Sequence, residues 1–282
     1  MIAGSRRAQA WRERALDGVS VLAGLLWLLP LLTMLLTALK PDAEIYARDF
    51  SWLPASPTLD HFAKAWRAAP FALYTLNSLL VAAATTASTL LVASLAAYAL
   101  SRLRFPGRVA ILGGILSTTM VPFQAVLIPF FILLTQLHLV NSRPGLVVAY
   151  LAIFLPFAIF MLGSFMRSLP REVEESARVD GSSWFGVWWH IALPMARPAL
   201  AAVGIYTFIE SWKEFFVALV MTNSQAIRTV PLGLALFRSD LPGIGWGEIM
   251  ASALTAGLPA IVVFLLLQRQ FISGLTEGAV KG

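Results

Sequence analysis

LPREVEESARVDGSSWFGVWWHIALPMARPAL, residues 169–200, is a polar segment that lies between two long apolar stretches. The stretch before it, 144–166, has no charge and is long enough to cross the hydrocarbon core of a membrane. The stretch after it, 199–221, is also predominantly apolar. The segment carries seven formal charges, on Arg171, Glu172, Glu174, Glu175, Arg178, Asp180 and Arg197. Because charges are costly inside lipid, this pattern predicts a loop in water between two membrane spans.

The whole chain has the composition of an integral membrane protein. Of its 282 residues, 58% are hydrophobic and 13% are charged, with a mean hydropathy of +0.76; soluble domains carry about 25% charged residues. The net charge of +6 does not indicate nucleic-acid binding, because the basic residues lie in short loops beside apolar segments. The chain has no cysteine, and its three histidines lack the spacing of metal ligands, so no metal site is expected.

Six apolar stretches predict an all-α membrane protein with six transmembrane helices. Backbone polar groups in lipid must be hydrogen-bonded within the segment, which favours helices of roughly 20 residues. The expected spans are 19–39, 73–100, 109–136, 145–166, 199–221 and 249–268. Residues 1–18 form a basic tail before an uncleaved first span, and residues 167–198 form the largest polar loop. Five prolines are expected to bend the spans: Pro30, Pro122, Pro129, Pro156 and Pro259.

Basic residues predict the orientation of these spans. Thirteen lysines and arginines fall on the side of the two termini and the 167–198 loop, and seven fall on the opposite side. Cytoplasmic loops carry an excess of lysine and arginine. Both termini and the large polar loop are therefore expected in the cytoplasm, with the 40–70 loop outside.

The polar loop is expected to start with a short helix from Arg171 to Asp180. Ser168 is the expected N-cap, and Pro170 suits the first turn. Gly181 is expected to end the helix in a left-handed conformation. Pro194 is expected to break the chain before the next span. Taken alone, the helix fits an ordinary amphipathic helix at the membrane interface equally well.

A spaced motif in the same loop decides between these readings. Glu175-Ser176-Ala177 is followed by Gly181 and then by Ile191, Leu193 and Pro194. This spacing resembles the EAA loop of bacterial ABC-importer permeases, in which Glu-Ala-Ala is followed at fixed distances by Gly and by Ile-x-Leu-Pro. Ser176 replaces the middle alanine and is also small.

Three other segments are similar to the maltose-type sugar permeases, specifically the subunit of the MalG kind. They are MVPFQAVLIPFFILLTQLHLVNSRPGLVV at 120–148, ESWKEFFVAL at 210–219, and the last 33 residues from Met250, counted on the printed sequence. Lys213 stands where the family usually has asparagine. With the loop, the similarity extends over about residues 73–282.

The resemblance implies a type I ABC-importer permease (MetI-like) fold, with a single ABC transmembrane type-1 domain over 19–282. It implies a permease for a sugar, oligosaccharide or related polyol in the bacterial inner membrane. The implied partners are a second, MalF-like permease, two cytoplasmic ATPase subunits and an external substrate-binding protein. The loop would dock on the ATPase through Glu175, Ser176, Ala177, Asp180, Gly181, Ile191, Leu193 and Pro194.

No cofactor is expected on this chain, since ATP and Mg would be bound by the partner ATPase. The sequence contains no G-x-x-x-x-G-K-[ST] phosphate loop and no catalytic constellation, so the chain is not expected to be an enzyme on its own.

Three charges inside the fifth span, Glu210, Lys213 and Glu214, leave several interpretations open. Helical spacing lets Lys213 meet Glu210 and puts Glu214 on the same side. The group is interpreted as a polar lining of the translocation pathway or a gate, as a structural ion pair between helices, or as a break in the helix near the outer interface. Trp212 and Phe215 would either contact sugar or pack against lipid or the partner. An ion-coupled carrier with a proton site at Glu210 or Glu214 is the alternative function. Such carriers often contain inverted repeats, and none is visible here.

Overall fold

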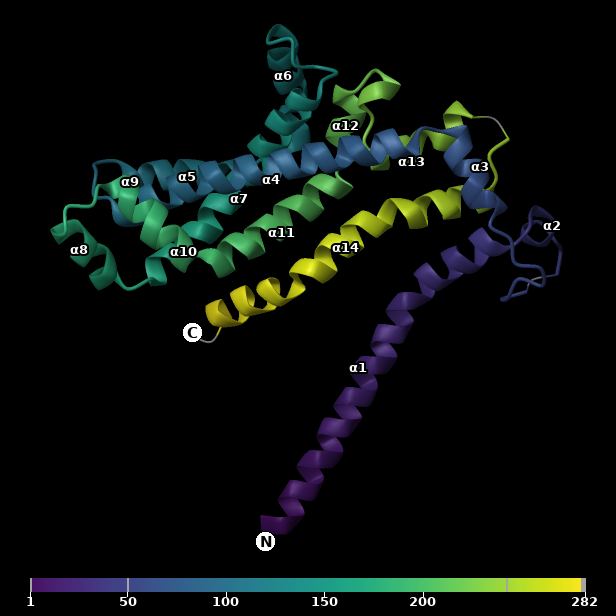
Figure 1. Ribbon diagram of the computed structural model, residues 1–282, viewed down its shortest axis with the longest axis horizontal. Helices are drawn as coiled ribbons and strands as arrows, with labels where there is room; N and C mark the ends of the chain where they lie inside the picture. Colours follow the sequence, from purple (N-terminus) through teal and green to yellow (C-terminus); the bar gives the residue numbers. More distant parts are fainter. Residues whose placement is uncertain (1, 50, 242, 280–282) are drawn as a thin grey trace. The chain divides into compact units, whose positions relative to one another are not determined.

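The computed structural model describes residues 2–49, 51–241 and 243–279, and within this part every regular element is a helix (Figure 1). Side chains are described between residues 16 and 266, apart from 50, 240 and 242. The side chains of the predicted tail up to residue 15, and those of residues 267 and 268 at the end of the predicted sixth span, therefore lie outside the described residues.

Within the described residues, four helices are long and apolar enough to cross a membrane. They are α1 (Ile2–Leu39, apolar from Leu16), α4 (Phe71–Arg102), α7 (Arg143–Ser168) and α14 (Trp246–Ala279, apolar to Leu266). Two bent helix pairs pass the same test, which gives six segments if each pair is one span. The chain is thus an all-α integral membrane protein, as the apolar stretches predicted.

The predicted third span is not one helix. It consists of α5 (Arg108–Thr118) and α6 (Phe123–Gln136), which meet at 100°. Pro122 stands at the break with an extended ψ of 127°, immediately before α6. Proline lacks an N–H and disfavours a helical conformation in the residue before it, so the first helix ends there. The expectation of a bend at Pro122 was correct, and the bend is sharp enough to divide the segment into two helices.

The predicted fifth span is also interrupted. The helix α11 (Arg197–Lys213) ends before Glu214, which is extended with a ψ of 125°, and α12 (Phe216–Met221) follows. The Glu214 carboxylate accepts hydrogen bonds from the backbone N–H groups of Val217 at 2.8 Å and Ala218 at 3.1 Å. Glu214 therefore caps α12, and the expectation that it extends the helical face of Lys213 was wrong. Of the interpretations left open, the break in the helix is present.

The chain divides into two compact units, residues 1–69 with 237–255 and residues 70–236 with 256–282. In the second unit, α4, α7 and α11 pack side by side, with α5 against α4 and α7 (Figure 1). Small residues such as Ala93 and Ala97 of α4 are fully buried beside Leu162 and Met166 of α7, which allows the helix backbones to approach closely. A second cluster around Tyr150 adds α12 and α13 (Val230–Asp240), which follows a short 3₁₀ helix, η2 (Gln225–Ile227).

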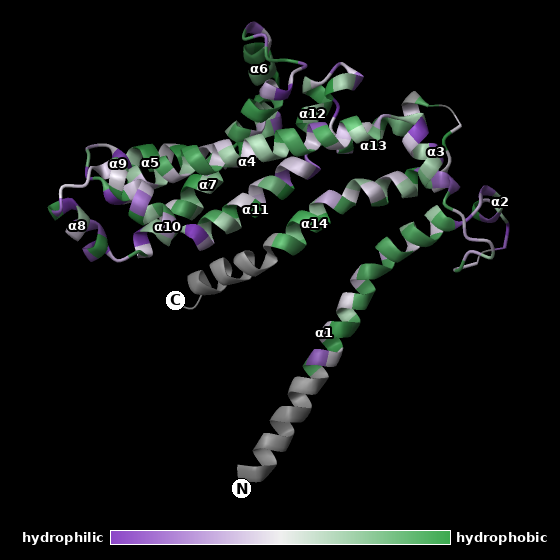
Figure 2. Ribbon diagram, in the orientation of Figure 1, coloured by the Kyte–Doolittle hydropathy of each residue, from purple (hydrophilic) through white to green (hydrophobic). Residues whose placement is uncertain are grey.

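The first unit contains α1, the short helices α2 (Asp42–Ile45) and α3 (Asp60–Ala68), and the start of α14. The apolar part of α1 is exposed along most of its length. Figure 2 shows how hydrophobic this part of the helix is. Such a surface suits contact with lipid or with another membrane helix.

Candidate coupling site

The polar loop after α7 folds into four short helices: α8 (Arg171–Val179), α9 (Trp184–Val187), the π-helical turn η1 (Trp188–Ala192) and α10 (Leu193–Met195). Leu169 and Pro170 are extended, so α7 and α8 are separate helices. Ser168 belongs to the end of α7, where its hydroxyl donates to the carbonyl of Phe165 at 2.8 Å. The expectation that Ser168 caps the loop helix was therefore wrong, because two extended residues separate it from α8.

The end of α8 follows the prediction. Gly181 has a φ of +89° and no atom within 4 Å of a Cβ added to it, so its backbone conformation is what favours glycine. The backbone N–H of Gly181 donates to Arg178 O at 3.1 Å, and that of Ser182 donates to Ala177 O at 3.0 Å. This pair of bonds is the Schellman motif, which satisfies the last carbonyls of a helix.

The predicted motif residues fall into two groups. Glu175, Ser176, Asp180 and Gly181 are exposed on α8 or at its end, and Ala177 is half-buried against the main core cluster. The other group lies in the part of the loop that follows α9: Ile191 and Leu193 are half-buried against the same cluster, and Pro194 is exposed. The structure therefore presents Glu175, Ser176, Asp180 and Gly181 to the outside, while Ala177, Ile191 and Leu193 fix the loop to the bundle.

The turn η1 leads into the fifth span. The backbone N–H of Leu193 donates to Trp188 O, five residues earlier, and Trp188 is buried. The chain then bends by 79° between the 184–195 segment and α11. The bend occurs at Ala196, whose ψ is 7°, rather than at Pro194, which is accommodated in the first turn of α10.

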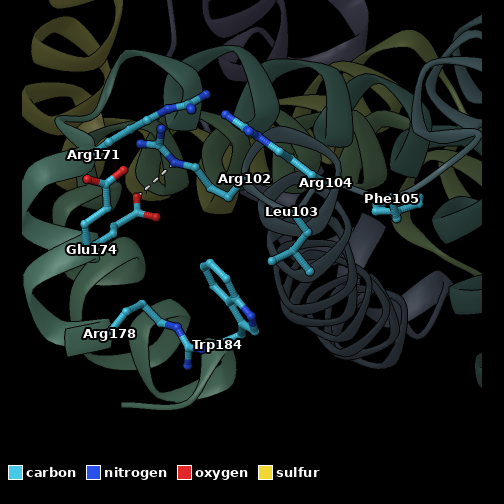
Figure 3. A pocket seen from close by; sticks show the side chains of 9 residues that line it. Arg102, Leu103, Arg104, Phe105, Arg171, Glu174, Arg178 and Trp184 are labelled. Carbon is cyan, nitrogen blue, oxygen red and sulfur yellow. Dashed lines mark ion pairs between the residues drawn. The ribbon is translucent and has the colours of Figure 1, made fainter. Parts of the chain in front are cut away.

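A buried ion pair that the sequence did not indicate joins α8 to the end of α4. Glu174 Oε1 lies 2.9 Å from Arg102 Nε, and the two side chains are 7% and 3% exposed (Figure 3). The Tyr98 hydroxyl donates to Glu174 Oε2 at 3.4 Å, and Arg102 Nη2 donates to the carbonyl of Leu169 at 2.8 Å. Burial raises the pKa of Glu174, and the Arg102 guanidinium opposes that rise.

A cleft of about 650 Å³ opens beside this pair. Figure 3 shows Arg104 and Arg171 at the same end as Arg102, with Arg178 and Trp184 at the other end. The Arg178 guanidinium lies 4.4 Å from the centre of the Trp184 ring and donates to Ser182 O. Four arginines and two glutamates line the cleft, so its charge favours acidic groups: Arg102, Arg104, Arg171, Arg178, Glu174 and Glu175.

The predicted pathway residues lie at the other end of α11. Lys213 Nζ is 2.8 Å from Glu210 Oε1, as the spacing predicted, and the two side chains are 62% and 28% exposed. Trp212 is buried and stacks on Phe208, with ring centres 6.1 Å apart. Trp212 is thus a core residue of this chain.

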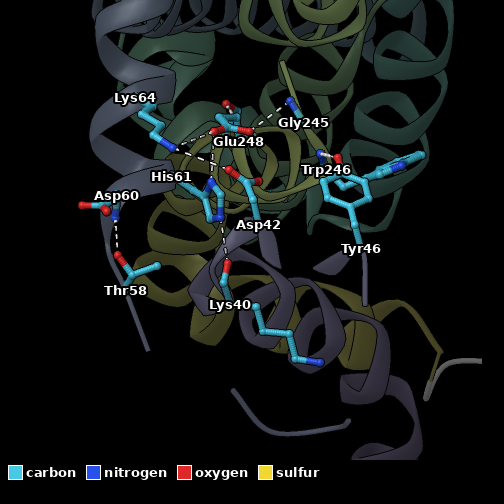
Figure 4. A network of polar contacts seen from close by, with 11 residues as sticks. Lys40, Asp42, Tyr46, Thr58, Asp60, His61, Lys64, Gly245, Trp246 and Glu248 are labelled. Atoms are coloured by element: carbon cyan, nitrogen blue, oxygen red, sulfur yellow. Dashed lines mark hydrogen bonds and ion pairs between the residues drawn. The ribbon is translucent and has the colours of Figure 1, made fainter. Parts of the chain in front are cut away.

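A polar network in the first unit was also missed. His61 is buried, with Nε2 2.7 Å from Lys40 O and Nδ1 3.0 Å from Glu248 Oε1 (Figure 4). Lys64 Nζ lies 3.7 Å from Asp42 Oδ2 and 3.9 Å from Glu248 Oε1. Although Asp42, His61 and Glu248 are close enough to share a cation, both ring nitrogens already face protein acceptors and Lys64 offsets the carboxylates. The network ties α3 and the end of α1 to the start of α14.

Comparison with known proteins places this chain in a family. The family described as binding-protein-dependent transport system inner membrane component matches residues 89–276. The sulfoquinovosyl glycerol transport system permease protein SmoH of Agrobacterium fabrum is 34% identical, over 90% of this chain and 89% of its own length. The trehalose transport system permease protein SugB of Mycobacterium tuberculosis is 33% identical, over 99% of this chain and 100% of its own length. The diacetylchitobiose uptake system permease protein DasC of Streptomyces coelicolor is 34% identical over 90% and 91%.

Solved structures agree on the fold. A chain from the crystal structure of a bacterial ABC transporter involved in the import of the acidic polysaccharide alginate superimposes with a TM-score of 0.81. The alignment covers 95% of this chain and 98% of that chain, at 22% sequence identity. A second structure, of the alginate ABC transporter in complex with an alginate pentasaccharide-bound periplasmic protein, aligns with a TM-score of 0.65 and 15% identity, over 92% and 93% of the two chains.

Proposed function

The chain belongs to the family of binding-protein-dependent transport system inner membrane components and is a permease of that kind, and from this membership we propose its substrate, its partners and its coupling element. The substrate is a sugar, an oligosaccharide or a related polyol. Relatives that match nearly the whole chain are named for sulfoquinovosyl glycerol, trehalose and diacetylchitobiose, which supports a carbohydrate.

The proposed assembly pairs this chain with a second, different permease, with two cytoplasmic ATPase subunits and with an external binding protein. The exposed apolar surface of α1 supports a partner helix in the membrane. The described part of the chain contains no phosphate-binding loop, so ATP and Mg would be held by the ATPase. The excess of basic residues on the side of α8 supports a cytoplasmic position for this helix and for both termini.

We propose that α8 is the element that docks on the ATPase. The observation that carries this proposal is the exposure of the motif residues: Glu175, Ser176, Asp180 and Gly181 all face outward, on a helix that ends at both sides in a change of backbone direction. Small side chains at Ser176 and Ala177 permit close approach, and Glu175 and Asp180 provide polar contacts.

The substitution Gly181→Arg tests the docking proposal. It adds a large cation at the contact and forces a side chain into a left-handed conformation, at a cost of about 1 kcal/mol. We expect the permease to insert normally, while co-purification with the ATPase, transport and substrate-stimulated ATP hydrolysis all fall.

Gly243→Arg is the matched control. Gly243 has a φ of +93° and open space around its Cβ position, but it lies in the other unit, on the side expected to be external. This variant bears the same backbone strain and should retain the ATPase. Normal ATPase binding and transport in Gly181→Arg would refute the docking proposal.

A further inference from the structure

We infer that the ion pair between Arg102 and Glu174 is the attachment through which movement of α8 is passed to α4, so that both are positioning residues for the coupling of ATP hydrolysis to transport. This inference rests on the proposed docking of α8 on an ATPase. It assigns a role to two residues that lie outside the Glu-Ser-Ala motif.

The first argument is how little else fixes α8. Glu174 is the one buried residue of this helix, and Ala177 alone of the others is half-buried. The remaining side chains are exposed, including Val173 and Val179. A helix that buries so little apolar surface gains little packing energy, so the ion pair is its main connection to the bundle.

The second argument is that the backbone on either side of α8 is not helical. Leu169 and Pro170 are extended before it, and Gly181 is left-handed after it. The helical hydrogen bonds of α7 therefore do not continue into α8, and a rotation of α8 need not be passed to α7 through the main chain. Arg102 also donates to the carbonyl of Leu169, so the same guanidinium contacts both α8 and the extended link between α7 and α8.

The third argument is the position of Arg102 at the end of α4. Arg102 is the last residue of this helix, and Tyr98, one turn earlier, donates to the same carboxylate. Because the pair is buried, water and salt screen its attraction little. Moving Glu174 away from Arg102 would leave two buried charges without a partner, which is costly. Displacement of α8 thus pulls on α4, whose Ala93 and Ala97 pack in the main core.

The test replaces both partners, because removal of one partner leaves a buried charge unpaired whereas two apolar side chains of similar size are often tolerated. Purified transporter with Arg102→Met and Glu174→Met is reconstituted with its ATPase and binding protein. The measured quantity is substrate transported per ATP hydrolysed, at equal amounts of inserted permease and bound ATPase. We expect ATPase binding to persist, because the exposed face of α8 is intact, and this ratio to fall roughly 2- to 30-fold, the range for residues along a coupling route.

A matched control removes one exposed arginine and one exposed acidic residue outside α8, with Arg104→Met and Asp17→Met. It removes the same two charges from the chain, leaves the exposed face of α8 intact and should leave the ratio unchanged. An unchanged ratio in the Arg102 and Glu174 variant, with the ATPase bound, would overturn the inference while the docking proposal stands. The docking proposal is tested separately, by measuring how much ATPase co-purifies with the Gly181→Arg variant.

A charge exchange covers the case in which the apolar variant does not reach the membrane. Arg102→Glu combined with Glu174→Arg restores opposite charges at the same two positions. We expect it to transport more substrate per ATP than either single exchange, each of which places two like charges together. If the combined exchange is no better than the single ones, the pair is not the attachment.

Discussion

At the scale of single residues, Glu174 and Glu175 are neighbours with opposite surroundings. Each residue turns a helix by about 100°, so the first carboxylate points at Arg102 while the second is exposed. Glu175 is one of the exposed motif residues of α8, whereas Glu174 connects α8 to the helix bundle through Arg102. A chain that lost only Glu174 would keep its docking surface and lose the connection behind it.

The buried carboxylate gives stability a defined dependence on pH. Burial raises the pKa of Glu174 above 4.5, the ordinary value that applies in the unfolded chain. The folded chain therefore binds the proton of the Glu174 carboxyl more tightly than the unfolded chain does. The resulting contribution to stability is full below that value and is lost as pH rises through the folded-state pKa. Glu174→Gln removes the titrating group, so the stability difference between wild type and variant should change across this window. Thermal unfolding in detergent over a pH series measures it, and a constant difference would contradict the assignment.

The charges near the end of α11 allow a test of the pathway proposal. We propose that Glu210 and Lys213 face a water-filled path, because their ion pair remains partly exposed and charges in lipid are costly. The chain has no cysteine, so Lys213→Cys creates a single thiol. A water-soluble thiol reagent should label it in the assembled transporter, and bound substrate should slow the labelling. Trp27→Cys, on the exposed apolar face of α1, is the control that should resist the reagent.

At the scale of helices, apolar length predicted where spans exist but not where they break. Hydropathy measures how well residues suit lipid and does not show where a helix changes direction, so it marked 109–136 and 199–221 only as segments that could span a membrane. Pro122 gave a visible signal for the first break. The second break has no proline, and it depends on a carboxylate, Glu214, that binds the N–H groups of the next helix. A glutamate in an apolar stretch indicated that Glu214 has a special role, but the sequence did not show that this role is to cap α12.

Close packing between α13 and α4 predicts the effect of one methyl group. A Cβ on Gly233 would lie 2.3 Å from Cδ2 of Tyr74, whose ring is buried and whose hydroxyl accepts a hydrogen bond from Gln225. Gly233→Ala should therefore lower the free energy of unfolding by about 1–3 kcal/mol. Gly113→Ala in α5, where nothing lies within 4 Å, should be neutral or stabilising by up to about 1 kcal/mol. Denaturant unfolding in detergent compares the two, and equal effects would contradict the packing argument.

At the scale of the whole molecule, topology is the feature to test first. The bias of basic residues predicts that the C-terminus and α8 lie on one side and the 40–70 loop on the other. A reporter fused after Gly282 should be active only as a cytoplasmic reporter, and one inserted near Ser56 only as an external reporter. The reverse pattern would exclude the contact between α8 and a cytoplasmic ATPase.

The membrane class, the apolar segments and the exposed motif could be predicted, because they depend on composition or on local spacing. Contacts between distant segments could not. His61 and Glu248 are 187 residues apart, and the pair exists only after α3 meets the start of α14. Arg102 similarly looked like one more basic residue of a cytoplasmic loop, and its partner in α8 becomes visible only once α4 and α7 have packed.

The π-helical turn η1 absorbs one residue of the motif. In this turn the N–H of Leu193 donates to Trp188 O, so 188–192 contains one residue more than an α-helical turn does. Deleting one residue there would restore ordinary α-helical winding and leave the following chain in nearly the same orientation, so Ala196 should stay buried. Deleting one residue from the regular helix α11 would instead rotate the residues after it by about 100°. A one-residue deletion between Gly181 and the fifth span should therefore be tolerated best at η1.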